Sequence, residues 1–403
     1  MNKNINIAVI GLGQIGSYVL NELNTKKKDI ETKTGKRIKV IAISAKNKNK
    51  KRKFKINKKI FYSNPLDILK IKNLDIVIEA IGLSDGISKK IIETALKNKI
   101  HVITPNKALI SKHGDKLGEL AEKNKVNLEF EASVAGGIPI VRTIKEGLAT
   151  NKITKVYGIL NGTCNYIMSE MERTKDSFKN VLKMAQKLGY AEPGNPKLDL
   201  NGYDALAKIK ILTSLAFNKK ISKSECLMEG IENIDYADIK IADQLDFRIK
   251  LLGITEIINN SIFERVHPCL VKKDSYIGNV DGVMNAVILN GSPIGESVLQ
   301  GEGAGPGPTS SALMSDLLSI LRGNIKYPFG ISKNKRLKPI IFNKDQSSNS
   351  LYLRLEVKDK PGVLSSITKI LAKYKISIQR LIQIPDHKSK TASIVLITHN
   401  ANE

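Results

Sequence analysis

The stretch that most constrains the fold of this chain lies close to its N-terminus. A continuously apolar run, INIAVI at residues 5–10, leads directly into GLGQIG and then into a helical pattern. Such a run is typical of a strand buried on both faces of a parallel sheet, and glycines at this spacing leave backbone N–H groups and the helix dipole free to face a pyrophosphate. The alternative, a tight turn in some other α/β sheet, does not explain the three spaced glycines. We therefore predict a dinucleotide site formed by Gly11, Leu12, Gly13, Gln14, Ile15 and Gly16.

Further apolar strands are indicated at residues 39–44, 75–82 and 99–104, each separated from the next by a helix-like segment. This alternation predicts an α/β fold with a Rossmann-type, doubly wound parallel sheet. After residues 126–133 the alternation weakens, and a glycine turn leads into a helix expected at about 139–149. A domain boundary therefore belongs near residue 135.

We expect four parts along the chain. Residues 1–135 form the Rossmann domain, which the glycine-rich stretch and helix at about 301–325 complete. Residues 136–300 mix helices with strand-like pieces and predict an α+β domain. Residues 326–349 are polar and proline-containing, which predicts a linker, and residues 350–403 show a β-α-β-β pattern.

The net charge of +26 comes almost wholly from lysine, because only 10 of the 65 basic residues are arginine. Proteins that read nucleic acids favour arginine for its bidentate geometry and aromatic side chains for stacking, whereas this chain has no Trp and 5% aromatic residues. We therefore expect no nucleic-acid partner. The alternative, a basic nucleic-acid-binding protein, is motivated by the charge alone.

The compartment is indicated by the cysteines and by the N-terminus. Cys164, Cys226 and Cys269 lie far apart without metal-ligand spacing, which predicts reduced thiols. The N-terminus enters a strand without the apolar core of a signal peptide, and no apolar run approaches the ~20 residues that a bilayer span needs. We expect a soluble, cytoplasmic protein that has no membrane partner.

The end of the second strand bears on the choice of cofactor. Sites specific for NAD usually place an acidic side chain there, to accept from the ribose 2′-OH and to repel a 2′-phosphate. This sequence offers Ala45, Lys46, Asn47 and Lys48 instead. We therefore predict NADPH, with Lys46 as a contact, although these lysines could equally do no more than solvate a loop.

Asp204 and Lys208 stand four residues apart on a helix whose flanks are apolar, which indicates that the helix is buried most of the way round. On an exposed helix the pair would contribute only about 0.3–0.5 kcal/mol. On a buried helix, burial and the carboxylate partner tune the pKa of the lysine, which makes it a usable proton-transfer group. The pair therefore points to chemistry if the helix is buried.

Three further side chains join this pattern. Lys107 follows the strand at 99–104, at the sheet edge where open α/β folds place their chemistry, although a solvated lysine is the alternative. Glu192 and Asp199 lie in a Pro/Gly-rich loop and suit a substrate ammonium. Together these residues indicate carbonyl reduction, or alcohol oxidation, on an amino-acid-like substrate. A non-catalytic amino-acid sensor is the competing interpretation, which the loss of either lysine would favour.

Eight segments, all in the family's order over roughly residues 5–325, resemble the homoserine dehydrogenases: GLGQIG, EAIG, TPNKALI, FEASVAGGIPI, GILNGTCNYI, GYAE, LDLNGYDALAKIKIL and GEGAGPGPT. The resemblance implies NAD(P)H-dependent, reversible reduction of L-aspartate 4-semialdehyde to L-homoserine, in the biosynthesis of threonine, methionine and isoleucine. It also implies that residues 136–300 bind substrate and mediate dimerisation, and that the protein is a homodimer or homotetramer. A related dehydrogenase acting on another amino-acid aldehyde does not explain the DALAK lysine and the GYAE carboxylate together.

The resemblance also assigns roles. Lys208 matches the family's proton-transfer lysine, and Lys107 matches the second active-site lysine, near cofactor and substrate. Glu192 matches the carboxylate that takes the substrate ammonium, while Asp204 matches the aspartate that holds substrate or its water, and Asp199 is also expected to bind substrate. The residues expected to contact the cofactor beyond the glycine loop are Lys46, Lys107, Gly189 and Gly303.

The turn EASVAGGI matches the family's monovalent-cation site, expected to hold Na⁺. Carbonyl oxygens suit a hard cation. The alternative is a glycine turn that serves only to provide positive φ. The residues expected to supply oxygens, mainly from the backbone, are Glu131, Val134, Gly136 and Ile138.

The β-α-β-β tail, with its KDKPGVLSSI segment, resembles an ACT domain, a small ferredoxin-like regulatory module that often binds amino acids. A complete ACT domain has the order β-α-β-β-α-β. We therefore expect an incomplete ACT-like domain, with weak or absent feedback by threonine, or with its sheet completed by a partner chain.

Overall fold

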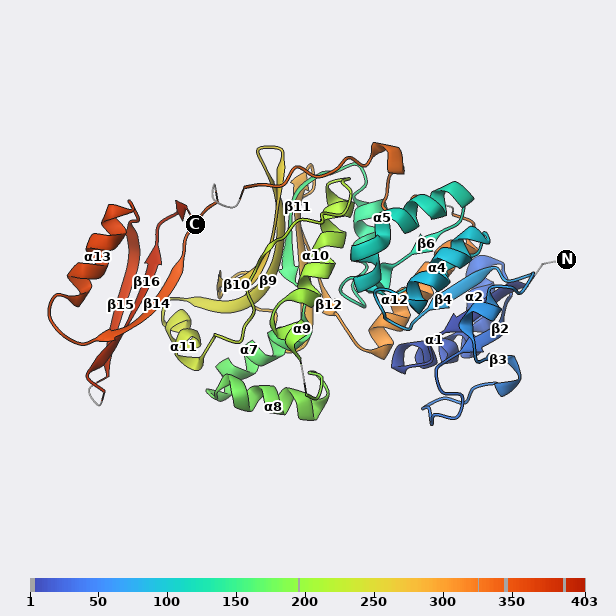
Figure 1. Cartoon of the computed structure of the whole chain (residues 1–403), viewed down its shortest axis with the longest axis horizontal. Helices are drawn as coiled ribbons and strands as arrows, with labels where there is room; N and C mark the ends of the chain where they lie inside the picture. The colour runs from blue at the N-terminus through green and yellow to red at the C-terminus, as the bar shows by residue number, and fades with distance from the viewer. Residues whose placement is uncertain (1–3, 195, 325, 344–346, 387–388, 403) are drawn as a thin grey trace.

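The computed structural model describes residues 4–194, 196–324, 326–343, 347–386 and 389–402. Three sheets follow one another along the long axis of the molecule (Figure 1). A parallel-sheet domain lies at one end, a mixed-sheet domain occupies the middle, and a small antiparallel sheet lies at the other end. The α/β class expected from the sequence is confirmed.

The first sheet has six parallel strands in the order β3-β2-β1-β4-β5-β6. This is the doubly wound order, in which the connections reverse direction beside the first strand and leave a crevice at the carboxyl ends. The glycine loop leaves β1 at this place, as the sequence predicts. The strands are β1 Ile5–Ile10, β2 Ile38–Ser44, β3 Phe61–Tyr62, β4 Ile76–Glu79, β5 His101–Ile103 and β6 Leu128–Glu129.

Helices cover both faces of this sheet. Ile7 and Val9 of β1 share a core with α1 and α12, whereas Ala8 and Ile10 face the core that contains α4 and α5. The continuously apolar run of β1 is therefore explained, because both of its faces are buried. The helices are α1 Gln14–Thr25, α2 Lys27–Thr34, α3 Pro65–Ile68, α4 Ile87–Lys97, α5 Lys107–Asn124 and, from much later in the chain, α12 Pro306–Leu321.

The mixed sheet has the order β12-β11-β7-β9-β10-β8. Helices α7, α10 and α11 pack against β9 and its neighbours. The sequence analysis above did not single out β9 or β12. The strands are β7 Lys152–Ile159, β8 Leu227–Met228, β9 Phe247–Ile258, β10 Ser261–Lys272, β11 Met284–Ser292 and β12 Gly295–Glu302.

The helices of this domain include the one on which the predicted Asp-Lys pair lies. The helix expected at about 139–149 is shorter than predicted, since α6 passes into a single π turn at Thr143–Gly147. The helices are α6 Ile140–Arg142, α7 Gly162–Thr174, α8 Phe178–Leu188, α9 Lys197–Leu200, α10 Tyr203–Ala216 and α11 Tyr236–Gln244.

The C-terminal sheet has the predicted β-α-β-β order, and its strands are arranged β14-β16-β15. Its apolar face packs on α11, where Val395 and Ile397 meet Ile241 and Leu245. The elements are β13 Ser348–Asn349, β14 Tyr352–Lys358, α13 Val363–Lys373, β15 Ile378–Asp386, β16 Thr391–Thr398 and β17 Ala401–Asn402, which pairs with β13.

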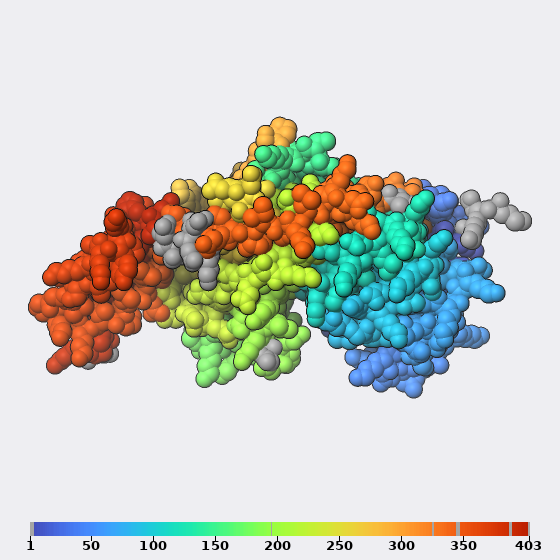
Figure 2. Space-filling view, turned by 45° about the horizontal axis from the view of Figure 1, so that its top comes forward, coloured from blue at the N-terminus to red at the C-terminus, as the bar shows by residue number. Residues whose placement is uncertain are grey.

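Residues 326–343, here called the arm, cross the surface of both larger domains before the chain reaches the C-terminal sheet (Figure 2, orange). The sequence predicts a linker here, and residues 344–346 of that linker lie outside the described residues. The arm is packed rather than loose: Phe329 and Arg336 are buried, and backbone hydrogen bonds join Leu337 to Lys220 and Ile340 to Ile262.

Among the described residues, no helix combines the length and the apolar character needed to cross a bilayer.

The second and third glycines of the GLGQIG segment, Gly13 and Gly16, allow a direct test of the packing. A Cβ at Gly16 would lie 1.8 Å from the carbonyl oxygen of Gly11, whereas a Cβ at Gly13 would meet no atom within 4 Å. Because the backbone must move to relieve the clash, Gly16→Ala is expected to lower the free energy of unfolding in urea by about 3 kcal/mol. Gly13→Ala, the matched control, should change it by less than about 1 kcal/mol. Equal effects of the two substitutions would contradict this packing.

Candidate active site

Four of the charged residues expected from the sequence meet where the N-terminus of α5 faces the N-terminus of α10, between the two larger domains (Figure 1): Lys107, Asp199, Asp204 and Lys208. Lys107 is the first residue of α5 and follows β5 by three residues. Asp204 lies in the first turn of α10, after Gly202 in the left-handed conformation (φ 87°) that begins the helix. Lys107 is thereby placed at the carboxyl edge of the parallel sheet, and Asp204 meets it from the other large domain.

Asp204 bridges two lysines. Its Oδ1 lies 2.7 Å from Nζ of Lys107, and its Oδ2 lies 2.7 Å from Nζ of Lys208. The side chains of Asp204 and Lys208 are each 8% exposed, whereas that of Lys107 is 41% exposed. The helix is buried over most of its surface, so the condition under which the sequence pattern points to chemistry is met.

Two groups from the loop before α7 complete the cluster. Nζ of Lys208 donates to the carbonyl oxygen of Leu160 at 2.5 Å. Nδ2 of Asn161 donates to Oδ1 of Asp199 and to Oδ2 of Asp204, both at 2.9 Å. Asn161 is also the N-cap of α7, since its Oδ1 accepts from the amide of Cys164 at 2.8 Å. Asp199 is thereby held beside Asp204.

The sequence analysis missed Asn161 as a member of the site. Its signal was available in part, because Asn followed by Gly-Thr before a helical run is a helix-start pattern. Nothing in that pattern indicates that the amide also bridges two carboxylates, one from α9 and one from α10.

Burial and pairing move the three pKa values in different directions. Burial alone would raise the pKa of Asp204, but the ammonium groups of Lys208 and Lys107 more than offset it and hold that pKa well below its usual range. Burial lowers the pKa of Lys208, and Asp204 offsets only part of this effect. For Lys107 the charge of Asp204 outweighs burial, so its pKa is raised. The site therefore contains one firmly charged lysine and one that releases its proton more readily.

The glycine loop presents Gly13 and Gln14 to solvent at the N-terminus of α1. Lys46 follows β2 and is exposed. Arg52, which the sequence analysis did not single out, anchors the basic loop instead: its Nε donates to the carbonyl oxygen of Leu12 at 3.2 Å, and its other nitrogens bind carbonyl oxygens of the loop itself. The basic run is therefore folded against the glycine loop.

Three other predicted residues lie outside the charge cluster. Glu192 is exposed, and within the described part of the chain its carboxylate makes no hydrogen bond or ion pair. Gly189 ends α8 in the left-handed conformation, which by itself accounts for a glycine. Gly303 is packed against Asn285, where a Cβ would lie 2.1 Å from Cγ, and its carbonyl abuts Gly136.

The turn expected to bind a cation is buried at all four predicted positions. The carboxylate of Glu131 accepts from the amides of Val141 and Arg142, yet burial raises its pKa to about 7. Among the described hydrogen bonds, none reaches the carbonyl oxygens of Val134 or Gly136. Buried carbonyls without a donor fit a hard cation. The carbonyls of Glu131 and Ile138 accept backbone N–H groups.

The comparison with known proteins agrees over the whole chain. Family models described as "Homoserine dehydrogenase, NAD binding domain", "Homoserine dehydrogenase" and "ACT domain" match residues 11–131, 139–318 and 351–403. The homoserine dehydrogenases of Neisseria gonorrhoeae and Helicobacter pylori are each 39% identical to this chain. Both matches cover 100% of this chain, and they cover 93% and 94% of the two relatives, respectively. The crystal structure of a homoserine dehydrogenase from Thiobacillus denitrificans is 36% identical, with a TM-score of 0.91 over 100% of this chain and 92% of that one. The chain therefore belongs to the homoserine dehydrogenase family, whose members are NAD(P)-dependent oxidoreductases.

Proposed function

We propose that the protein catalyses the reversible, NAD(P)H-dependent reduction of L-aspartate 4-semialdehyde to L-homoserine. The observation that carries this proposal is the bridge Lys107–Asp204–Lys208 beside the carboxyl edge of a doubly wound sheet, in which Asp204 and Lys208 are buried. A carbonyl reductase needs a proton donor and a positive charge at the carbonyl oxygen. The bridge supplies both groups within one cluster.

The nicotinamide would supply a hydride to C4 of the aldehyde. The chain's own part is to hold the aldehyde and to deliver a proton to its oxygen. Lys208 suits the donor, because burial lowers its pKa towards the working range. Lys107 suits a fixed positive charge near the oxygen, because Asp204 raises its pKa. Because their pKa values are shifted in opposite directions, Lys208 can act as the acid while Lys107 provides a constant positive charge.

The substrate's ammonium group would be taken by carboxylates at the mouth of the cluster. Asp199 lies beside Asp204 and is held by Asn161. Glu192 stays a prediction from the resemblance; its carboxylate is exposed and has no partner among the described residues, so it is available to a ligand. The roles assigned to Gly189 and Gly303 in cofactor binding also stay predictions, and their packing described above is a structural reason for glycine at both positions.

For the cofactor we propose NADPH, with Lys46 near the 2′-phosphate. The support is the absence of a carboxylate at residues 45–48 and the folding of the basic loop against the glycine loop through Arg52. We further propose Na⁺ at the turn formed by Glu131, Val134, Gly136 and Ile138. A homodimer or homotetramer, a cytoplasmic location and a role in threonine, methionine and isoleucine biosynthesis also stay proposals.

Lys208→Ala is expected to lower kcat for NADPH oxidation with aspartate semialdehyde by about 10²- to 10⁴-fold, because it removes the proton donor. The rate is followed by the absorbance of NADPH. Lys210→Ala is the matched control, because Lys210 lies on the same helix but donates to the carbonyl oxygen of Ser224, outside the cluster. The kcat of this variant should stay close to that of the wild type. Full activity in Lys208→Ala would remove Lys208 from the mechanism.

Asp204→Asn should move the basic limb of the pH–kcat profile for reduction to lower pH. Asp204 favours the charged form of Lys208, so its neutralisation lowers the pKa of Lys208 further. Reduction requires protonated Lys208, and activity is therefore lost at a lower pH. Asp281→Asn is the control, since Asp281 holds another buried lysine, Lys250, in the mixed-sheet domain. The proposed roles fail if the limb stays in place or moves to higher pH.

Lys46→Ala should raise the KM for NADPH about tenfold and leave the KM for NADH unchanged, because only NADPH carries the 2′-phosphate. Lys97→Ala, which removes an exposed lysine at the end of α4, controls for the general loss of positive charge. Equal changes in the two KM values would show that Lys46 does not contact the 2′-phosphate.

A further inference from the structure

Arg336 of the arm touches both of the helices that carry the proposed catalytic charges. Its Nη2 lies 2.7 Å from Oδ1 of Asp115 on α5 and 2.6 Å from Oγ of Ser214 on α10. The same nitrogen lies 3.1 Å from the carbonyl oxygen of Lys219, just after α10. The side chain of Arg336 is 3% exposed. One guanidinium group thus joins the parallel-sheet domain to the mixed-sheet domain.

The guanidinium group of Arg336 stacks on an aromatic ring. Its central carbon lies 3.9 Å from the ring centre of Phe329, which also belongs to the arm. That ring is wedged against α5 at Gly114, where a Cβ would lie 2.9 Å from Cζ of Phe329, and it packs on Phe130 with 5.2 Å between ring centres. Arginine suits this position because its planar group can stack and bind several acceptors at once.

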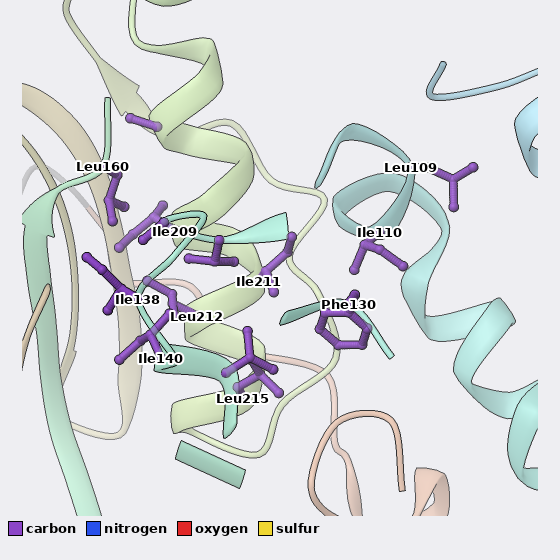
Figure 3. Packing of buried hydrophobic residues seen from close by; sticks show 14 of the residues in the cluster. Leu109, Ile110, Phe130, Ile138, Ile140, Leu160, Ile209, Ile211, Leu212 and Leu215 are labelled. Atoms are coloured by element: carbon purple, nitrogen blue, oxygen red, sulfur yellow. The ribbon is translucent and has the colours of Figure 1, made fainter. Parts of the chain in front are cut away.

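The contacts of Arg336 lie further along the same two helices whose first turns meet in the site, at the middle of α5 and in the last turn of α10. Asp115 is eight residues after Lys107, or about 12 Å along α5, and Ser214 is six residues after Lys208, or about 9 Å along α10. Between the contacts of Arg336 and the charged site, the two helices meet through apolar side chains (Figure 3). These include Ile110 of α5 and Ile211 of α10, together with Phe130, which follows β6. Apolar contacts are not directional, so they do not by themselves fix the relative slide of two helices.

We infer that Arg336 is a positioning residue for the active site, which sets the register of α5 against α10 and thereby the contact between Lys107 and Asp204. The inference rests on the proposed function. Its effect on rate follows from geometry, because a displacement of about 1 Å at reacting groups can cost about 10²-fold in rate. Asp115 has a second donor, the amide of Ile221, so it keeps a partner when the arginine is removed.

The test compares Arg336→Gln, Arg336→Lys and a matched control, Arg354→Gln. Arg354 forms ion pairs with Asp235 and Asp238 and so joins the C-terminal sheet to the mixed-sheet domain, away from α5 and α10. For each variant we would measure kcat and KM for aspartate semialdehyde reduction, the pH profile of kcat, the Kd for NADPH by fluorescence and the melting temperature. Hydrogen exchange at the first turns of α5 and α10 gives a readout that does not depend on turnover.

Arg336→Gln is expected to lower kcat about tenfold or more, with the Kd for NADPH within about twofold of wild type. The basic limb of its pH profile should move to higher pH, because the positive charge of Lys107 lowers the pKa of Lys208, and this effect weakens when Lys107 moves away from the pair. Arg336→Lys should recover part of the rate, because an ammonium can reach Asp115 or Ser214 but cannot hold both and stack. Exchange at the two first turns should rise in Arg336→Gln and not in Arg354→Gln.

The inference is overturned if folded Arg336→Gln and Arg336→Lys keep the wild-type kcat and pH profile while only the melting temperature falls. If Arg336→Gln does not fold, Arg336→Lys and Asp115→Asn decide by the same criteria. If the wild type shows no reduction of aspartate semialdehyde, the proposed function fails. Hydrogen exchange then still tests the positioning role. That role is contradicted if the first turns of α5 and α10 exchange in Arg336→Gln as they do in wild type.

Discussion

The site is organised around the burial of one carboxylate, that of Asp204. A buried ion is tolerated only when opposite charges and hydrogen bonds replace its lost hydration. Lys208 pairs with this carboxylate from the next turn of the same helix, and Lys107 pairs with it from the other large domain. The same electrostatic requirement that stabilises the first turn of α10 therefore also holds the two domains face to face. The two lysines end with different proton affinities because one of them is buried and the other is half-exposed.

The chain crosses between its domains more than once, and this explains why the site joins distant segments. After the mixed sheet, α12 returns to pack on α1, and the arm then crosses back over α5 and α10 towards the C-terminal sheet (Figures 1 and 2). The polar composition of the arm conceals this role, because its anchors are a few buried residues, among them Phe329, Arg336 and Phe342, in a segment that is otherwise largely exposed. A segment can be mostly solvent-facing and still be fixed by a few buried contacts.

A second cluster of charged residues joins the two larger domains. Asp316 of α12 accepts from the amide of Glu131 and pairs with Arg142, and Glu129 pairs with Lys145. Burial raises the pKa of Asp316 well above its ordinary value, and the nearby carboxylates Glu129 and Glu131 raise it further. The turn proposed to hold a cation therefore lies beside three carboxyl groups, those of Glu129, Glu131 and Asp316, and a positive ion there would favour their charged forms.

The sequence by itself determined the features that depend on near neighbours in the chain. The strand-glycine-helix unit, the alternation that gives a doubly wound sheet and the spacing of Asp204 and Lys208 all follow from local backbone geometry and from periodicity, and the structure contains each of them. Family resemblance added the substrate, which no local pattern specifies. Only the tertiary structure decided which distant groups meet: the amide of Asn161 between two carboxylates, and Arg336 on an aspartate 221 residues away. These contacts could not be read from the sequence, because they depend on how whole helices pack, and packing is set by the summed burial of many side chains rather than by the residues that finally touch.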